Sequence, residues 1–305
     1  MRVNVKRWRW RKSIEGRVGG HEARRNLTWQ STRTHTCFAF GALLCAGHFY
    51  LSRPNLLDLM PVTGLYLAHR VSHTAIPYLK AFRQYVMEDA VPVFANLSER
   101  ANAIAALEFK RIGERHAGEE SYGDMSGVAE TAQDKGQVFY DTMVAIRQMS
   151  LNLFAAGLFH LLEQQLADLC RDGTFETAPP RDTKLVEVST WYRNNFNLDL
   201  SNLSAWPKIE QLRLLANSVK HGEGSSAVNL RATRPDLFQN PDLCELLGCF
   251  PAMHSARVLR LPLAGEDLFV TTAVFSEFSG AVHSLFTEIA EHFFAHGDEY
   301  YLVGG

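Results

Sequence analysis

Residues 128–171 read VAETAQDKGQVFYDTMVAIRQMSLNLFAAGLFHLLEQQLADLCR, and this stretch decides the fold class. Its apolar residues recur mostly at steps of three and four, the period that places side chains on one face of an α-helix. Gly173, Pro179 and Pro180 follow and are expected to end the helix. The sequence therefore predicts one long core helix with apolar positions Phe139, Met143, Ile146, Leu153, Phe154, Leu158, Leu161, Leu162 and Leu169.

The segments before and after this helix also show helical periodicity. A helix is expected from Pro77 toward Glu114, with a kink or break at Pro92, because proline cannot continue the backbone hydrogen bonds. A loop is expected at residues 113–127, which are rich in Gly, Glu and Ser. After the long helix, shorter helices are predicted at residues 184–196, from an N-cap at Ser204 with Pro207 in the first turn, and at residues 242–247.

The C-terminal part combines irregular chain, a hairpin and a last helix. Irregular chain is expected beyond Gly222, apart from the short helix at residues 242–247. Residues 257–263 and 268–270 are predicted to pair as a small β-hairpin, followed by an amphipathic helix that carries apolar residues from Phe275 to Phe293. The predicted fold class is mainly α: a bundle of long antiparallel helices with a small β-hairpin at about residues 256–270.

Charge divides the chain of 305 residues into two parts. Residues 1–53 carry eleven Lys or Arg against two acidic residues, net +9, whereas the remainder carries twenty against thirty-one, net −11. We expect a basic, disordered or weakly ordered leader at residues 1–60 and a helical-bundle domain at residues 61–305. The acidic domain argues against a broad nucleic-acid groove, because Lys and Arg carry most of that affinity.

The leader has two further features. Its first twelve residues, MRVNVKRWRWRK, interleave Arg with Trp, a composition that suits anionic lipid or nucleic acid. Residues 37–51 form an apolar run of fifteen residues, shorter than the roughly 20 that span a bilayer as a helix. Membrane contact through residues 1–60 therefore stays open. The five cysteines are irregularly spaced, so no disulfide framework is expected and a cytoplasmic location is predicted.

A polar line of Glu210, Arg213, Asn217 and His221 leads into Gly222. Steps of three and four residues place these side chains on one stripe of a helix, beside an apolar stripe that faces the core. Cleavage of a phosphate ester can use His221 as acid or base, Arg213 for developing charge and Asn217 for orientation, without a metal. Lys220 and Glu210 are candidate binding residues next to these three candidate catalytic residues.

A purely structural interpretation fits the same residues. The negative end of a helix dipole stabilises cations such as Lys220 and His221 in the last turn. Gly222 can adopt the left-handed conformation that commonly ends a helix. Glu210 and Arg213 then form a surface ion pair. Under this interpretation the stripe is a solvated helix face with no chemistry.

The segment Asn217-Ser-Val-Lys-His221-Gly222, set in a bundle of long helices, resembles the HEPN superfamily. The resemblance implies a helical bundle, often dimeric, and frequently a metal-independent endoribonuclease of a toxin, antiphage or RNA-processing system. The family signature is an arginine, four to six residues and a histidine, commonly with Asn directly after the arginine. Asn217 and His221 match it, but Ala216 occupies the arginine position, and Arg213 lies seven intervening residues before His221.

Two functional hypotheses follow. The first is a HEPN-like protein that acts on RNA, with Arg213, Asn217 and His221 in catalysis. The second is a non-catalytic helical module that dimerises or binds a partner protein or nucleotide, and Ala216 favours it. Either protein is expected to form a homodimer, with the aromatic residues of the last helix as a candidate contact: Phe293, Phe294, Tyr300 and Tyr301.

No cofactor or metal site is expected from the sequence. His69 and His73 are spaced four residues apart, as are His292 and His296, but neither pair has a carboxylate or thiol at a spacing that completes a site. A glycine-rich phosphate loop and a dinucleotide-binding fingerprint are also missing from the sequence.

Overall fold

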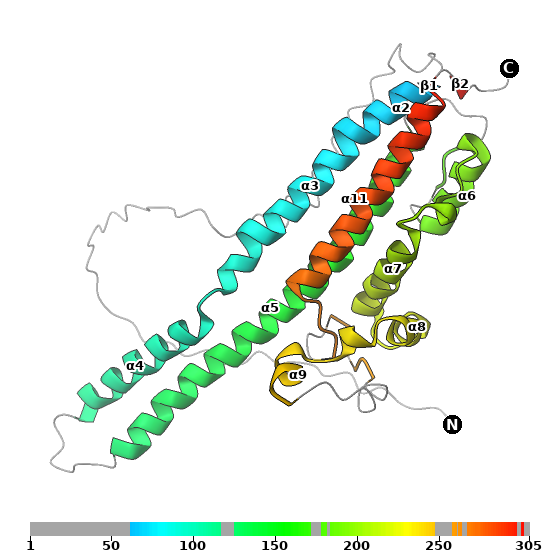
Figure 1. The fold of residues 1–305 in the computed structure, drawn as a ribbon. Coiled ribbons are helices and arrows are strands. Elements are labelled where there is room, and N and C mark those ends of the chain that lie inside the picture. Colours follow the sequence, from blue (N-terminus) through cyan, green and yellow to red (C-terminus); the bar gives the residue numbers. More distant parts are fainter. Residues whose placement is uncertain are drawn as a thin grey trace, which may run out of the picture. The chain divides into compact units, whose positions relative to one another are not determined.

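A computed structural model describes residues 62–116, 125–171, 178–181, 184–247, 258–260, 262–263, 267–297 and 300–301. All of them belong to the unit Asn55–Gly305. The predicted leader, residues 1–60, and its possible membrane contact lie outside the described residues. The fold is mainly α, as predicted (Figure 1).

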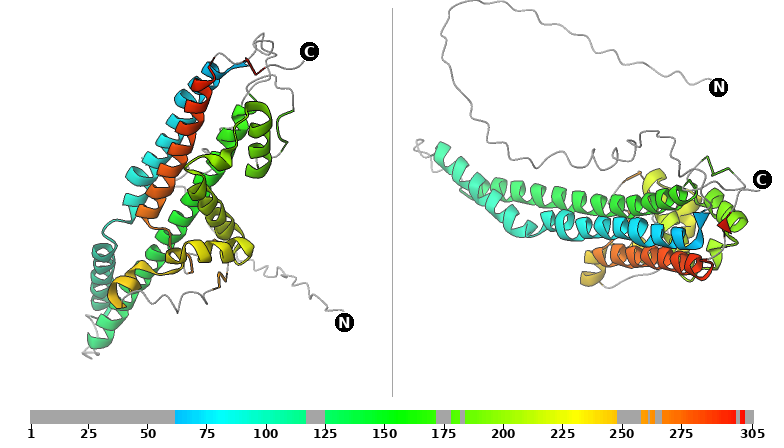
Figure 2. Two further views of the ribbon diagram at one scale, coloured as in Figure 1. Left: turned by 45° about the vertical axis from the view of Figure 1, so that its right-hand side comes forward. Right: turned by 90° about the horizontal axis from the view of Figure 1, so that it is seen from above.

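The longest element is α5 (Met125–Leu169), which confirms the predicted core helix and starts three residues earlier. Its N-terminal half runs antiparallel to α4 (Leu97–His116), and this pair continues past the start of α11 (Thr272–Ala295) in every view (Figures 1 and 2). The two helices approach closely at Gly136, where an added Cβ would lie 2.8 Å from the carbonyl oxygen of Ala101. Both helices extend into the predicted loop at residues 113–127, whose centre lies outside the described residues.

Glu108 on α4 forms an ion pair with α5. Its carboxylate accepts hydrogen bonds from Arg111 on the same helix and lies 3.2 Å from the ammonium of Lys135 on α5. The hydrogen bond from Arg111, together with Lys135, lowers the pKa of Glu108 to about 2, although burial acts in the opposite direction. This ion-pair cluster joins α4 to α5, and Lys135 is the residue next to Gly136, where the two helices approach closely.

The N-terminal helices form one interrupted rod. It consists of α2 (Gly64–Arg70) and α3 (Ile76–Gln84), with π-helical turns at Val71–Ala75 and Tyr85–Ala90. The predicted break at Pro92 is confirmed by a 3-10 turn at Val91–Phe94, after which α4 starts at Leu97. The helical chain begins at Gly64 rather than at the predicted Pro77.

The shorter helices largely agree with their predicted positions. They are α6 (Leu185–Phe196), α7 (Trp206–His221) and α9 (Pro241–Leu247). The exception is α8 (Ser225–Thr233), which replaces the irregular chain expected beyond Gly222 and is followed by a 3-10 turn, η7, at Pro235–Phe238. The nine-residue sequence of α8, SSAVNLRAT, is too short to repeat the apolar spacing that indicates a helix, and only Ala227 and Leu230 of it are buried.

Strand pairing differs from the prediction. A short antiparallel ladder joins β1 (Val62–Thr63) to β2 (Tyr300–Tyr301) near the ends of α2 and α11. The predicted hairpin does not appear: none of the described residues among 258–270 is in a strand. Its backbone is bound by α5 instead, because Asn152 donates to the Leu268 carbonyl at 2.9 Å and accepts from the Val270 amide at 3.1 Å.

Helices α5, α7, α11 and α2 share one core. Phe293 belongs to it: the ring is fully buried and meets Phe196 edge-to-face, with centroids 4.8 Å apart. The expectation that Phe293 lies at a dimer surface is therefore wrong. Phe294 is 70% exposed, and the side chains of Tyr300 and Tyr301 lie outside the described residues.

Candidate functional site

The start of α7 is held by the last helix rather than by its own cap. The N-cap is Ala205 and not the predicted Ser204, while Pro207 lies in the first turn as expected. Glu288 on α11 accepts hydrogen bonds from the Ser204 amide at 2.7 Å, the Ser204 hydroxyl at 2.7 Å and the Ala205 amide at 3.2 Å. The positive end of the α7 helix dipole also stabilises a carboxylate at this position. Glu288 thus fixes where the polar line begins.

The polar line lies on the accessible side of α7, as its spacing predicts. Glu210, Arg213 and Asn217 are half-buried, and Lys220 and His221 are exposed. The opposite side packs into the core through Ile209, Leu212, Leu215, Ala216 and Val219.

The candidate catalytic residues do not converge. Arg213 donates from Nε to Glu210 Oε2 at 2.9 Å, with Nη2 2.8 Å from the same oxygen, so its guanidinium is directed toward the start of the helix. His221 lies eight residues later, which is about 12 Å along the helix axis. The side chains of Asn217 and His221 have no hydrogen bond to any described residue. Arg213 is therefore paired with Glu210, apart from the other two.

Position 216 explains the missing arginine of the signature. Ala216 is only 2% exposed and belongs to the core-facing side of α7. A guanidinium at this position would be taken out of water, which costs several kcal/mol unless it finds a partner. The orientation of α7 thus leaves room for a small apolar residue where the family signature has a cation.

Gly222 ends α7 in a backbone conformation that favours glycine. Its φ of +74° is positive, as expected for a left-handed residue, but its ψ of −143° lies outside the left-handed helical region that the sequence predicts. Its amide donates to the Ser218 carbonyl at 2.9 Å. An added Cβ would lie 3.4 Å from the nitrogen of Pro262 and 3.5 Å from the carbonyl oxygen of Leu259. The segment of residues 258–260 and 262–263, called here the return segment, therefore packs directly on the end of α7.

Glu223 and Arg231 form a junction that the sequence did not reveal. The Arg231 side chain is only 13% exposed, and its guanidinium lies 4.6 Å from the centre of the Phe238 ring. Glu223 also accepts a hydrogen bond from the Leu259 amide at 2.9 Å. Hydrogen bonds from Arg231, and then from Leu259, lower the pKa of Glu223 against the effect of burial. The glycine-rich loop thus joins two helices and carries a structural ion pair.

A second cation is also used within the fold. Arg234 binds Asp236 through Nε at 2.9 Å and Nη2 at 2.8 Å, and it reaches Glu277 on α11 at 3.3 Å. Lys208 on α7 binds the same Glu277. Hydrogen bonding to Asp236 raises the pKa of Arg234. These charges tie α7, η7 and α11 together and are satisfied by one another.

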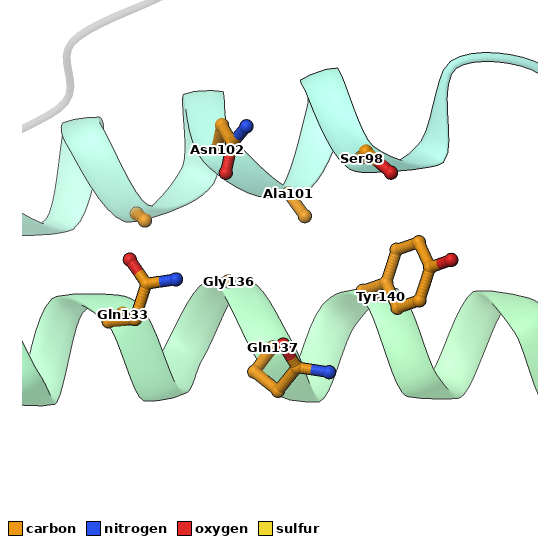
Figure 3. A pocket seen from close by; sticks show the side chains of 8 residues that line it. Ser98, Ala101, Asn102, Gln133, Gly136, Gln137 and Tyr140 are labelled. Carbon is orange, nitrogen blue, oxygen red and sulfur yellow. The ribbon is translucent and has the colours of Figure 1, made fainter. Parts of the chain in front are cut away.

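Two shallow grooves lie elsewhere, between α4 and α5. The smaller, of about 200 Å³, is lined by Ala101, Asn102, Ala105, Gln133 and Gly136, among others, and Ala101 on α4 faces Gly136 on α5 across it (Figure 3). The larger, of about 360 Å³, includes Glu99 and Arg147. Neither contains any of the five predicted site residues.

The histidine pairs do not build a metal centre with other described residues. The rings of His69 and His73 stack at 4.0 Å, and those of His292 and His296 lie 4.4 Å apart. Among the residues that the structure describes, no three His, Cys, Asp or Glu side chains are grouped as metal ligands. The described helices also include none that is both long enough and apolar enough to cross a membrane.

Comparison of the chain with protein-family models, with curated proteins and with solved structures finds no match.

Proposed function

We propose that this protein is a non-catalytic helical module, of the architecture that its HEPN resemblance implies, and that it binds a partner through α5. The observation that carries this proposal is an exposed apolar stripe on α5, called here the α5 stripe. Contiguous exposed apolar residues mark interaction surfaces more often than isolated ones do. The α5 stripe consists of five apolar residues and one threonine: Val138, Thr142, Ala145, Ile146, Met149 and Leu153.

The geometry of α7 supports the same proposal. Stabilisation of a transition state needs groups that already point at one reacting centre. Arg213 is paired with Glu210, His221 lies more than two turns further along, and Ala216 faces the core. A surface-exposed polar stripe that ends in a structural glycine agrees better with the capping interpretation than with an active site.

A second candidate function is action on RNA, as a metal-independent endoribonuclease of a defence or toxin-type system. It is favoured by Asn217 and His221, which are accessible on one side of α7 and carry no hydrogen bond to described residues. The Arg213–Glu210 pair is about one-third exposed, and such pairs contribute only about 0.3–0.5 kcal/mol. A phosphate group can compete for Arg213 at that energy, so RNA or nucleotide binding here is a testable alternative.

One assay separates the two candidates. Purified full-length protein is incubated with mixed cellular RNA in EDTA, and wild type is compared with His221→Ala and with Lys80→Ala. Lys80 is the control because it is an exposed cation on α3, outside the polar line of α7. The module proposal expects no cleavage that depends on His221. Cleavage by wild type and Lys80→Ala that disappears in a folded His221→Ala protein would establish the nuclease.

A cytoplasmic setting is part of the proposal. Cysteine spacing in the whole chain suggests no disulfide framework, and Cys170 is a buried thiol that forms no disulfide. Burial raises the pKa of the Cys170 thiol to about 12, which keeps it protonated and unreactive at neutral pH.

A further inference from the structure

Two histidines near the start of the N-terminal rod lie ring against ring on the surface. His69 belongs to α2 and His73 to the π-helical turn at Val71–Ala75, and both side chains are exposed. Their ring centroids are 4.0 Å apart and their planes are inclined by only 9°. Single π-helical turns are rare, and they occur frequently at functional sites. Two accessible imidazoles thus lie together at an unusual backbone turn.

The contacts of His73 determine which of its nitrogen atoms is free. Its Nδ1 lies 3.1 Å from the backbone carbonyl oxygen of His69. A carbonyl oxygen only accepts, so Nδ1 carries the proton of the neutral ring and Nε2 keeps its lone pair. Histidines that bind metals usually donate their second ring nitrogen to a carbonyl or carboxylate in this way. The ring of His69 makes no hydrogen bond to any described residue, so its nitrogens are available as well.

The distance between the two rings suits a shared metal ion. Bonds from Zn²⁺ to histidine nitrogen are about 2.0–2.1 Å long, so two nitrogens of a tetrahedral site lie about 3.3 Å apart. Rings stacked at 4.0 Å can reach that separation by a small rotation of two exposed side chains, because χ2 of histidine has a broad energy well. Two histidines four residues apart on a helix are also the zinc ligands of the His-Glu-x-x-His motif.

We infer that His69 and His73 together bind one divalent transition-metal ion through their Nε2 atoms. The ion belongs to the class that imidazole prefers, which includes Zn²⁺, Ni²⁺ and Cu²⁺. No third His, Cys, Asp or Glu among the described residues is grouped with the pair, so the chain supplies two ligands and water completes the coordination. The four-residue spacing alone predicts no site, whereas the orientation of the two rings favours one.

The surrounding sequence selects the kind of ion. Residues 62–87 contain no Asp or Glu, so this part of the rod offers nitrogen ligands and no carboxylate. Mg²⁺ and Ca²⁺ require oxygen ligands and are therefore not expected to compete. The guanidinium of Arg70, the nearest cation in the sequence, donates to the Thr74 hydroxyl at 3.2 Å. The inference concerns α2 and the turn after it, so it does not depend on the proposed roles of α5 and α7.

A second histidine pair has the same spacing but not the same free nitrogens. His296 Nδ1 lies 2.7 Å from the His292 carbonyl oxygen, which is the same local bond that His73 makes to His69. His292, however, is half-buried and donates from Nε2 to the Phe196 carbonyl at 3.1 Å. Its Nε2 is therefore already bonded within the fold. The two pairs separate the effect of spacing from the effect of free nitrogens.

Calorimetric titration of Zn²⁺ into metal-free, full-length protein tests the site. Wild type is compared with His69→Ala, His73→Ala and His296→Ala at about 100 µM protein in excess Mg²⁺. Each of the first two changes is expected to abolish one bound zinc ion or to weaken its binding at least about tenfold, because a ligand is lost. His296→Ala is the matched control, since it removes a histidine with the same Nδ1 bond, and it should bind zinc as wild type does.

Nuclear magnetic resonance of the ring nitrogens identifies the binding atoms. Zn²⁺ is expected to shift the Nε2 resonances of His69 and His73, which the two variants assign, and to leave those of His292 and His296 in place. Far-ultraviolet circular dichroism verifies that every variant is folded. Equal zinc binding by wild type, His69→Ala and His73→Ala overturns the inference. A loss in His296→Ala as large as that in His73→Ala also overturns it, because spacing alone would then explain the binding.

Discussion

The carboxylate of Glu223 accepts hydrogen bonds from both terminal nitrogens of Arg231, at 3.2 and 2.9 Å. This pair connects the loop after α7 to the α8 helix. The Leu259 amide donates to the same carboxylate at 2.9 Å, so the return segment is joined to them. The Glu223 side chain thus joins three segments around the end of the candidate site. Its removal should lower the free energy of unfolding of the whole domain.

Glu223→Gln is expected to lower the free energy of unfolding by about 1–3 kcal/mol, because it removes the charged acceptor of a largely buried guanidinium. Urea denaturation followed by circular dichroism measures the change. Glu210→Gln is the control: its partner Arg213 is about one-third exposed, so the expected change stays below about 0.5 kcal/mol. Equal effects of the two substitutions would contradict a structural role for Glu223.

The same pair predicts a pH dependence. Hydrogen bonds from Arg231, and then from the Leu259 amide, hold the pKa of Glu223 below its ordinary value of 4.5. A carboxyl whose pKa is lowered by folding contributes its full stability above its unfolded pKa and loses that contribution as the pH falls through its folded pKa. The difference between wild type and Glu223→Gln should therefore be complete at pH 6–7 and shrink below about pH 4.5. Urea titrations at several pH values check this, and a constant difference down to pH 3 would contradict it.

Features that depend on neighbouring residues could be predicted from the sequence, whereas contacts between distant segments could not. The long helix α5 and the end of α7 at Gly222 could be predicted from the sequence. Both depend on neighbouring residues along the chain: the spacing of apolar residues in α5 and the conformational freedom of a glycine after α7. The Glu223–Arg231 ion pair and the hydrogen bonds of Glu288 at the start of α7 could not be predicted, because the sequence does not show which distant carboxylate will lie beside a given donor. The side chain of Glu288 is 84 residues from Ser204, and only the packing of α11 on α7 brings them together.

The hairpin is not seen among the described residues for a related reason. Leu268, Phe269 and Val270 form a short apolar run typical of a strand, but the backbone groups of Leu268 and Val270 bind the side chains of Gln148 and Asn152. An apolar run of this kind indicates a buried segment and leaves its hydrogen-bond partner open. For the candidate site, the stripe of α7 could be predicted, whereas the pairing of Arg213 with Glu210 remained one of two alternatives.

Asn152 is expected to be among the most sensitive polar positions. It is 1% exposed, donates to the Leu268 carbonyl and accepts from the Val270 amide. Asn152→Ala leaves two buried backbone groups without a partner, at about 1–3 kcal/mol each. The free energy of unfolding should fall by about 2–6 kcal/mol, and the Val270 amide should exchange with deuterium faster. Ser150→Ala on the same helix is the control, since the Ser150 hydroxyl bonds only the Ile146 carbonyl of its own helix.

The two glycines of the His-Gly-Glu-Gly segment should respond differently to alanine. Gly222 has φ +74° and ψ −143°, a backbone conformation that residues with a side chain rarely adopt. Gly224 has φ 175°, an extended conformation that any residue adopts, and nothing lies within 4 Å of its added Cβ. Gly222→Ala should lower the melting temperature by an amount equivalent to about 1–3 kcal/mol, whereas Gly224→Ala should be close to neutral. Calorimetry of both proteins checks the difference, and a neutral Gly222→Ala would mean that α7 can end in another way.

An arginine at position 216, where the HEPN signature has one, should damage this protein rather than activate it. Ala216 is 2% exposed, so Ala216→Arg forces a guanidinium into the core or pushes α7 outward, and the expected loss of stability exceeds about 3 kcal/mol. Asn217→Arg, one residue later on the half-buried side, is the control and should cost less than about 1 kcal/mol. Urea denaturation and RNA cleavage in EDTA are measured on both variants. A stable Ala216→Arg protein that cleaves RNA would mean that α7 can rotate into a catalytic orientation, and the capping interpretation of His221 would then be wrong.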